Sequence, residues 1–179
     1  MDKYGKLISP DTLRFERLLP GPIERVWKYI TDSELRGKWL ASGEMELREG
    51  GDITFFFLHD NLSDEPDTIP EKYSEMKKGY HSKGKVLKLD PPKMLQFTWD
   101  NEGIVTITLS EEGDRIKLTL MHSKLEGRNT IIGGSAGWHT HLDILADNLH
   151  EVRPKPFWKV HMTMEKEYEE RLFGTKKGG

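Results

Sequence analysis

The residues best suited to chemistry lie close together in the stretch "WHTHLD", which places His139, His141 and Asp143 next to Trp138. Imidazole and carboxylate side chains hold metal ions and transfer protons. In a helix, residues two apart point about 200° away from each other, so the two histidines cannot face one ion. His139 and Asp143 share a polar edge with His150, which we interpret as a solvated face, and we expect no metal site. His141 lies about 60° from Trp138 and is a candidate for a pocket rim, with an ordinary boundary position as the alternative.

A helix through this stretch has one apolar stripe. Its members lie within about 40° of Trp138 and are Leu142, Leu145, Leu149 and Val152. Such a stripe must be buried, and we expect it to lie against the concave face of a sheet. The preceding "GGSAG", residues 133–137, lacks the strand and the spacing of a dinucleotide-binding loop. We expect its glycines to permit the turn into the helix.

The elements that would position these side chains follow from hydrophobic periodicity. Residues 12–19 alternate as a strand, and residues 22–30 and 33–39 have the spacing of two short helices. Strand patterns follow over residues 43–49, 52–59, 80–90 and 93–100, and over a hairpin at 103–125. The sequence therefore predicts an α+β fold with about six antiparallel strands, two short helices after the first strand, and a long helix near the C-terminus.

Strand parity and the helix stripe together predict an apolar, aromatic lining between sheet and helix. Its candidate members are Phe55, Phe57, Leu95, Phe97, Trp99, Leu118, Leu120, Trp138 and Leu142. Each residue alone is more often a core residue, but small-molecule sites are mainly apolar with a few polar groups. By the same parity, Arg17 and His122 are the inward polar candidates. His122 could bind a ligand or act as an acid or base, and the alternative is a histidine bonded to backbone at the core edge.

The amino-acid composition limits the classes of function that are possible. The 179 residues suit one domain, and the net charge of -3 supplies no cationic surplus for nucleic acid. Zero cysteines exclude disulfides, thiolate zinc sites and a cysteine nucleophile. No apolar run approaches the roughly 18 residues of a membrane span, and the N-terminus lacks the apolar core of a signal peptide. We expect a cytoplasmic protein that binds neither nucleic acid nor membrane. No catalytic motif is present, so we assign no catalytic residue and no cofactor.

Two segments depart from a simple sheet and helix. Residues 59–79 form a long acidic insertion, with six acids and three bases between residues 60 and 78. We interpret it first as a mobile loop, with a lid or a contact surface as alternatives. Residues 157–173 predict a further helix, because Phe157, Val160, Met164, Tyr168 and Leu172 share one face. That helix could pack within its own molecule, cover one end of a cavity, or contact a partner or a second copy.

Five motifs in order resemble a known family. They are "LLPGPIERVWKYITDSELRGKWL", "LREGGDITF", "GKVLKLDPPKMLQFTW", "LTLMHSKL" and "GWHTHLDILADNL". Between about Thr12 and Val152 the chain is similar to the C-terminal domain of the activator of heat-shock-protein-90 ATPase, in the START-like, Bet v 1-like (SRPBCC) helix-grip superfamily. The resemblance implies a curved antiparallel sheet gripping a long helix around a cavity, which in many relatives holds lipids, sterols, polyketides or flavonoid-like molecules. We expect a helix-grip domain over residues 1–152 and a helical extension of the same domain over 153–179.

Three functions remain open from the sequence. The favoured one is an intracellular binding protein for a small hydrophobic or aromatic ligand held in the cavity. The second is a cyclase-, aromatase- or hydrolase-like enzyme that holds a reactive ligand against His122 or Arg17. The third is a chaperone-associated protein-contact module, or a homodimer, that uses residues 59–79 or 157–173.

Overall fold

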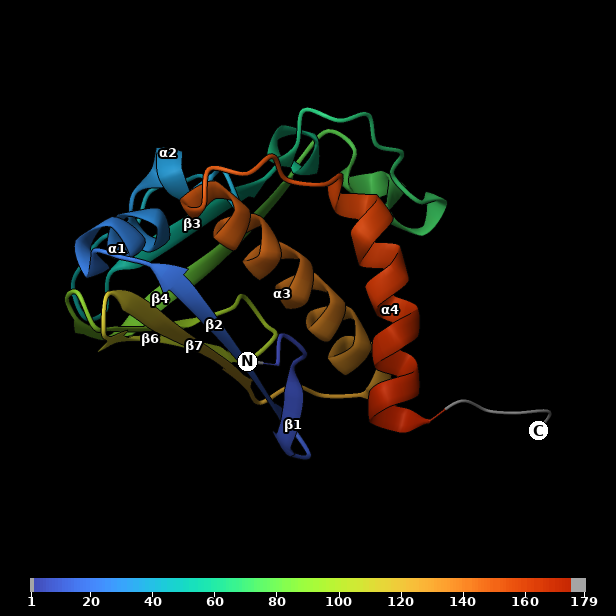
Figure 1. Cartoon of the computed structure of the whole chain (residues 1–179). Helices are drawn as coiled ribbons and strands as arrows, with labels where there is room; N and C mark the ends of the chain where they lie inside the picture. Colours follow the sequence, from blue (N-terminus) through green and yellow to red (C-terminus); the bar gives the residue numbers. More distant parts are fainter. Residues whose placement is uncertain (1, 175–179) are drawn as a thin grey trace.

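The computed structural model describes residues 2–174, in which a seven-stranded antiparallel sheet curves around a long helix (Figure 1). The sheet order is β1-β2-β7-β6-β5-β4-β3. The strands are β1 (Lys6–Ser9), β2 (Thr12–Pro20), β3 (Asp52–Phe57), β4 (Tyr80–Asp90), β5 (Met94–Thr98), β6 (Ile104–Glu112) and β7 (Arg115–Ser123). The predicted α+β class is confirmed.

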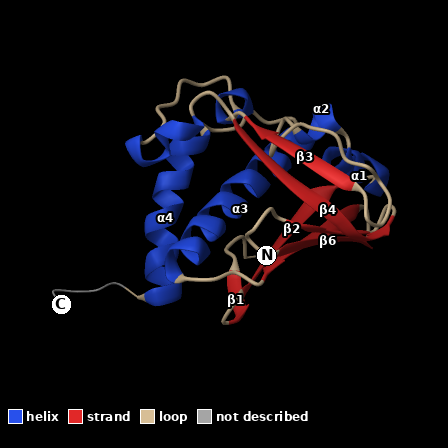
Figure 2. Cartoon of the chain, turned by 180° about the vertical axis from the view of Figure 1, so that it is seen from behind, coloured by secondary structure: helices blue, strands red, loops and turns tan. Residues whose placement is uncertain are grey.

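Two short helices lie at one end of the sheet and the last helix lies at the other, with the long helix between them (Figure 2). The short helices α1 (Ile23–Thr31) and α2 (Ser33–Arg36) follow β2, and Asp32 caps α2 by accepting a hydrogen bond from the Leu35 amide at 3.0 Å. The long helix α3 (Arg128–Leu149) lies on the concave face, and α4 (Phe157–Phe173) runs beside it. Across residues 2–174, none of the helices is both long and apolar enough to cross a membrane.

The core forms where the alternating strand residues meet the stripe of α3. Leu13, Phe15 and Leu19 of β2 are all buried, and they pair across the sheet with His122, Leu120 and Ile116 of β7. Because side chains alternate between the two faces of a strand, these residues point to the same side, toward α3. Leu142, Leu145 and Leu149 of α3 are buried as predicted, but Val152 lies beyond the end of the helix and is 56% exposed.

Several predicted elements have different bounds. In place of a strand over residues 43–49, the structure has only isolated bridges to β3, from Ser42 and from Met45. Most side chains of residues 43–49 are exposed and give a strand no face to bury. The seventh strand is instead β1, which the sequence pattern did not indicate. Helix α2 ends at Arg36 rather than near Trp39.

Helix α3 begins earlier than the sequence predicted. Its N-cap is Gly127, whose φ of 89° suits glycine. The "GGSAG" segment therefore lies inside the helix and does not form the turn into it.

The acidic insertion is packed against α4. It contains two 3-10 helices, η1 (His59–Leu62) and η2 (Glu71–Met76). Lys72 Nζ lies 2.6 Å from Glu165 Oε1, and Asp67 Oδ2 accepts a hydrogen bond from the Trp158 amide at 2.7 Å. Figure 1 shows the insertion beside the first turns of α4. In place of the mobile loop that we expected, the structure has a segment tied to the final helix. The last five residues of the predicted extension, 175–179, lie outside the described residues.

Candidate functional site

A cavity of about 500 Å³ lies between the sheet, α3, the insertion and α4. Its walls include five aromatic side chains: Phe57, Trp99, Trp138, Phe157 and Trp158. The Trp99 and Trp138 rings lie 4.9 Å apart between centroids. Four histidines also line the cavity, His59, His122, His141 and His161. The volume and the mainly apolar lining are typical of a small-molecule site.

One wall of the cavity is a face of α3 whose middle, between Thr130 and Trp138, is lined by glycine alone, and we call this middle part the bare face. Gly133, Gly134 and Gly137 line the cavity there, and Gly137 lies about one helical turn after the other two. A Cβ atom added to Gly133 would meet nothing within 4 Å, and one added to Gly137 would meet only His161 Cε1, at 4.0 Å. None of the three has a positive φ. Neither backbone conformation nor close packing therefore requires glycine at Gly133 or Gly137.

His122 lies at the end of β7 with both ring nitrogens engaged. Nδ1 accepts a hydrogen bond from the Trp138 indole at 2.9 Å, and an indole N–H can only donate. The proton of the neutral ring is then on Nε2, which donates to the Glu102 carbonyl. Burial lowers the pKa of His122, which outweighs the opposing effect of the carbonyl bond. His122 is a neutral side chain that positions the Trp138 ring, without a free nitrogen for acid–base chemistry.

The other three histidines surround Phe157, and we call His59, His141 and His161 the histidine end of the cavity. The Phe157 ring centroid lies 4.4, 4.7 and 5.3 Å from theirs, respectively. Burial lowers the pKa of His59 to about 4, of His141 to about 3 and of His161 to about 4. These rings are therefore neutral near pH 7. Within residues 2–174, no group of three or more His, Asp or Glu side chains is placed to hold a metal ion.

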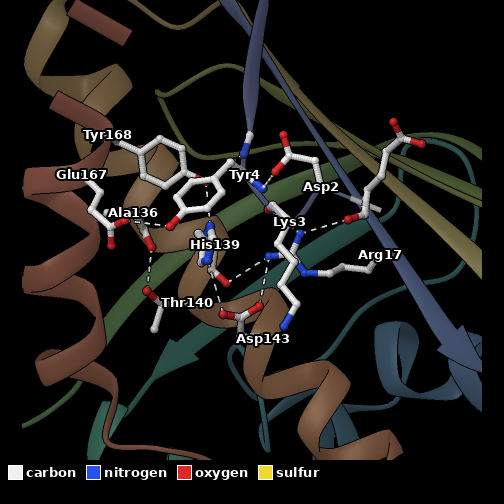
Figure 3. Close-up of polar contacts among 12 residues, drawn as sticks. Asp2, Lys3, Tyr4, Arg17, Ala136, His139, Thr140, Asp143, Glu167 and Tyr168 are labelled. Atoms are coloured by element: carbon white, nitrogen blue, oxygen red, sulfur yellow. Dashed lines mark hydrogen bonds and ion pairs between the residues drawn. The ribbon is translucent and has the colours of Figure 1, made fainter. Parts of the chain in front are cut away.

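Arg17 lies on the other side of α3, in a polar network shown in Figure 3. Its guanidinium donates to the Lys3 carbonyl at 2.7 Å and to Asp143 Oδ1 at 3.1 Å. His139 Nε2 lies 3.3 Å from Asp143 Oδ2, and His139 Nδ1 lies 2.7 Å from the Tyr168 hydroxyl. His139 was expected on a solvated face, yet it is buried because the N-terminal segment and α4 cover that face of α3.

The charges of this network are held in place by their partners. Burial lowers the pKa of Arg17, and Asp143 opposes that effect. For Asp143, burial raises the pKa, but the hydrogen bond from His139 and the charge of Arg17 outweigh it, so the net pKa is lowered. Arg17 and Asp143 line a separate cavity of about 520 Å³ and do not reach the aromatic one.

Comparison with known proteins identifies the family. The family model described as "Activator of Hsp90 ATPase homolog 1-like protein" matches residues 20–150, which is most of the chain. The chain belongs to this family. A protein of Bordetella parapertussis, solved by solution NMR, is 37% identical, with a TM-score of 0.79 over 96% of this chain and 91% of that one. The resemblance stated from the five motifs is therefore confirmed.

More distant relatives share the fold. The crystal structure of CalU16 from Micromonospora echinospora is 21% identical, with a TM-score of 0.65 over 95% of each chain. A conserved protein of unknown function from Enterococcus faecalis is 22% identical, with a TM-score of 0.67 over 92% of this chain and 86% of that one. Comparison with curated proteins finds no match.

The family match ends before the last wall of the cavity. Residues 20–150 include β3 to β7 and α3, but not α4, which contributes Phe157, Trp158 and His161. The histidine end is therefore built partly from the helix-grip domain and partly from the segment that follows it.

The structure brings together only some of the predicted lining residues. Phe57, Trp99, His122, Trp138 and His141 line the aromatic cavity. The other apolar candidates are buried in the surrounding core and are Phe55, Leu95, Phe97, Leu118, Leu120 and Leu142. The parity of a strand fixes the side to which a residue points, but a side chain on that side can be covered by its neighbours before it reaches the cavity.

Sequence reasoning missed the residues supplied by the insertion and by α4. These are His59, Tyr73, Phe157, Trp158 and His161. The available signal was the density of aromatic and histidine residues in "PFWKVH", which immediately follows a proline-rich break. The sequence predicted the apolar stripe of that helix, but His161 lies next to the stripe and was not predicted to be buried.

Proposed function

We propose that this chain is an intracellular protein that binds a small hydrophobic or aromatic molecule in the aromatic cavity. The observation that carries the proposal is the bare face of α3. A glycine inside a helix is about 1 kcal/mol less favourable than alanine, and side chains at Gly133 and Gly137 would meet no close neighbour. Side chains at these two positions would fill part of the cavity, so an open cavity is a physical reason for glycine there.

The walls support an aromatic guest. The cavity is lined by Phe57 of β3, by Trp99 just after β5 and by Trp138 of α3. Helix α4 adds Phe157 and Trp158. Aromatic pairs add about 0.5–1.5 kcal/mol beyond the burial of apolar area. Membership of this family, whose fold encloses a cavity, agrees with this function. The absence of cysteine agrees with a reducing compartment. The packing of α4 on α3 supports treating residues 153–179 as an extension of the same domain.

The two alternatives have less support. The enzyme alternative relied on His122 or Arg17, but both ring nitrogens of His122 are occupied by hydrogen bonds and Arg17 lines a separate cavity. A contact module would need free surfaces on the insertion and α4, but groups such as Lys72 and Glu165 are used to hold these two segments together.

The five tryptophans provide the experiment. Trp99, Trp138 and Trp158 line the cavity, whereas the side chains of Trp27 and Trp39 do not. On titration with small aromatic compounds, we expect the indole N–H signals of the three cavity tryptophans to shift in a ¹H–¹⁵N spectrum while that of Trp27 stays in place. Shifts spread equally over Trp27 and the cavity tryptophans would speak for non-specific binding and against the proposal.

A further inference from the structure

The hydrogen bonds at the histidine end fix which ring nitrogens can accept a proton from a ligand. His141 Nδ1 lies 2.7 Å from the Trp39 carbonyl oxygen. A carbonyl can only accept, so Nδ1 carries the proton of the neutral ring. The opposite nitrogen, Nε2, then has the lone pair. His141 therefore offers an acceptor on a ring that lines the cavity.

His161 is fixed in the opposite tautomer by Tyr73 and Glu165. The Tyr73 hydroxyl lies 3.1 and 3.2 Å from the two carboxylate oxygens of Glu165, so its single proton is donated there. His161 Nε2 lies 3.3 Å from the Tyr73 oxygen and 3.5 Å from Glu165 Oε2, both acceptors. Nε2 thus carries the proton, and the lone pair is on Nδ1. That Nδ1 is buried and has no hydrogen-bond partner among residues 2–174.

Both rings therefore have a lone pair fixed by bonds to the protein, but only His141 Nε2 is open to the cavity, because His161 Nδ1 and His59 Nδ1 are buried. A ligand that fills this end displaces the solvent that can reach His141 Nε2. An acceptor that is then left without a donor is unfavourable by about 1–3 kcal/mol. A ligand that brings a donor avoids that loss.

The charges around the cavity act against an anion. No lysine or arginine is found among the described residues that line it, while Asp100 and Glu102 are present. The histidines do not supply positive charge near neutral pH, because burial keeps their pKa values at about 4 or below. A carboxylate placed there would lose its hydration without gaining a cation.

We propose that the histidine end selects neutral aromatic molecules that carry a hydroxyl group, with His141 Nε2 as the acceptor of the hydroxyl proton, and that it discriminates against carboxylates. This inference rests on the proposed function and specifies the ligand class of the same cavity.

A series of four compounds on one ring system tests the inference with the unaltered protein. We expect β-naphthol to bind on the order of 3- to 10-fold more tightly than its methyl ether or naphthalene, as one hydrogen bond allows, and β-naphthoate to bind most weakly. Dissociation constants come from the shifts of the cavity indoles. If β-naphthol binds no more tightly than its methyl ether, or if the carboxylate binds most tightly, the inference is wrong. If none of the four binds, the proposed function fails as well.

One variant tests the named acceptor. His141→Asn keeps a side-chain N–H near the position of Nδ1 for the Trp39 carbonyl, but it has no acceptor at the position of Nε2, because its amide oxygen lies nearer the backbone. We expect this variant to reduce the preference for β-naphthol over its methyl ether by about threefold or more, with naphthalene affinity unchanged. His150→Gln, at the exposed end of α3, is the matched control. A preference that persists in His141→Asn would overturn the assignment.

Discussion

A larger side chain on the bare face of α3 should raise the stability of the protein and weaken ligand binding. Gly137 lies in the middle of the helix, and a Cβ atom there meets only His161 Cε1, at 4.0 Å. For Gly137→Leu, helix propensity favours the variant by about 0.8 kcal/mol. Partial burial of the leucine side chain in the cavity adds roughly 1 kcal/mol. We therefore expect the free energy of unfolding to rise by about 1–2 kcal/mol, which raises Tm by roughly 2–8 °C for a chain of this length.

The same variant should bind ligand poorly. The leucine occupies space between α3 and His161, so we expect the affinity for β-naphthol to fall by about tenfold or more, which corresponds to about 1.4 kcal/mol. Gly137→Ala is the matched control. It gains a similar helix propensity of about 1 kcal/mol but fills little of the cavity, and its affinity should change by less than about threefold.

Urea unfolding and the indole titration measure the two quantities on the same samples. A loss of stability in Gly137→Leu would mean that the space beside Gly137 is not open. A stable Gly137→Leu that binds β-naphthol as the unaltered protein does would refute the assignment of the cavity as the binding site.

Three further outcomes follow from the buried polar groups. At the histidine end, the folded pKa values of about 4, 3 and 4 lie below the ordinary 6.5, so the unfolded state binds more protons and the free energy of unfolding falls as the pH is lowered. Urea unfolding should show a loss of about 1 kcal/mol per histidine from about pH 6.5 to 5.5, and a flat profile would contradict buried neutral rings. Tyr168→Phe removes a hydroxyl that bonds His139 and the Gly5 amide, and should lower the free energy of unfolding by about 1–3 kcal/mol; no loss would show that this network does not hold the N-terminal segment. Glu165→Gln weakens the bonds to the insertion, so the amide hydrogen exchange of residues 63–76 should accelerate. Glu169→Gln alters an exposed ion pair and should leave that exchange unchanged, and equal effects of the two variants would argue against Glu165 as the link.

The sequence by itself determined the sheet, the long helix and the family. Alternation in β2 and β7 predicted which side chains point inward, since each strand position has only two directions. The leucine stripe of α3 predicted which face of the helix is buried, because helical rotation is fixed by sequence spacing. Such local periodicities, with five motifs in order, were sufficient for the α+β class and for the helix-grip architecture.

The positions and contacts of the polar groups were determined by tertiary structure. His139 was expected on a solvated face, but Tyr4 of the N-terminal segment and Tyr168 of α4 cover it, and the sequence carries no local sign of a neighbour more than twenty residues away. Arg17 points inward as predicted, yet α3 separates it from the aromatic cavity. The insertion was interpreted as mobile because it is long for a connection between two strands, whereas its ion pair and its aromatic contacts with α4 hold it in place.

The histidine end shows the limit of sequence reasoning most clearly. Its three rings come from η1, α3 and α4, at residues 59, 141 and 161, so no sequence window contains them together. Their pKa values and tautomers depend on burial and on the particular carbonyl or hydroxyl that each ring meets. These are properties of the packed molecule, because desolvation and hydrogen-bond partners exist only after distant segments have been brought into contact.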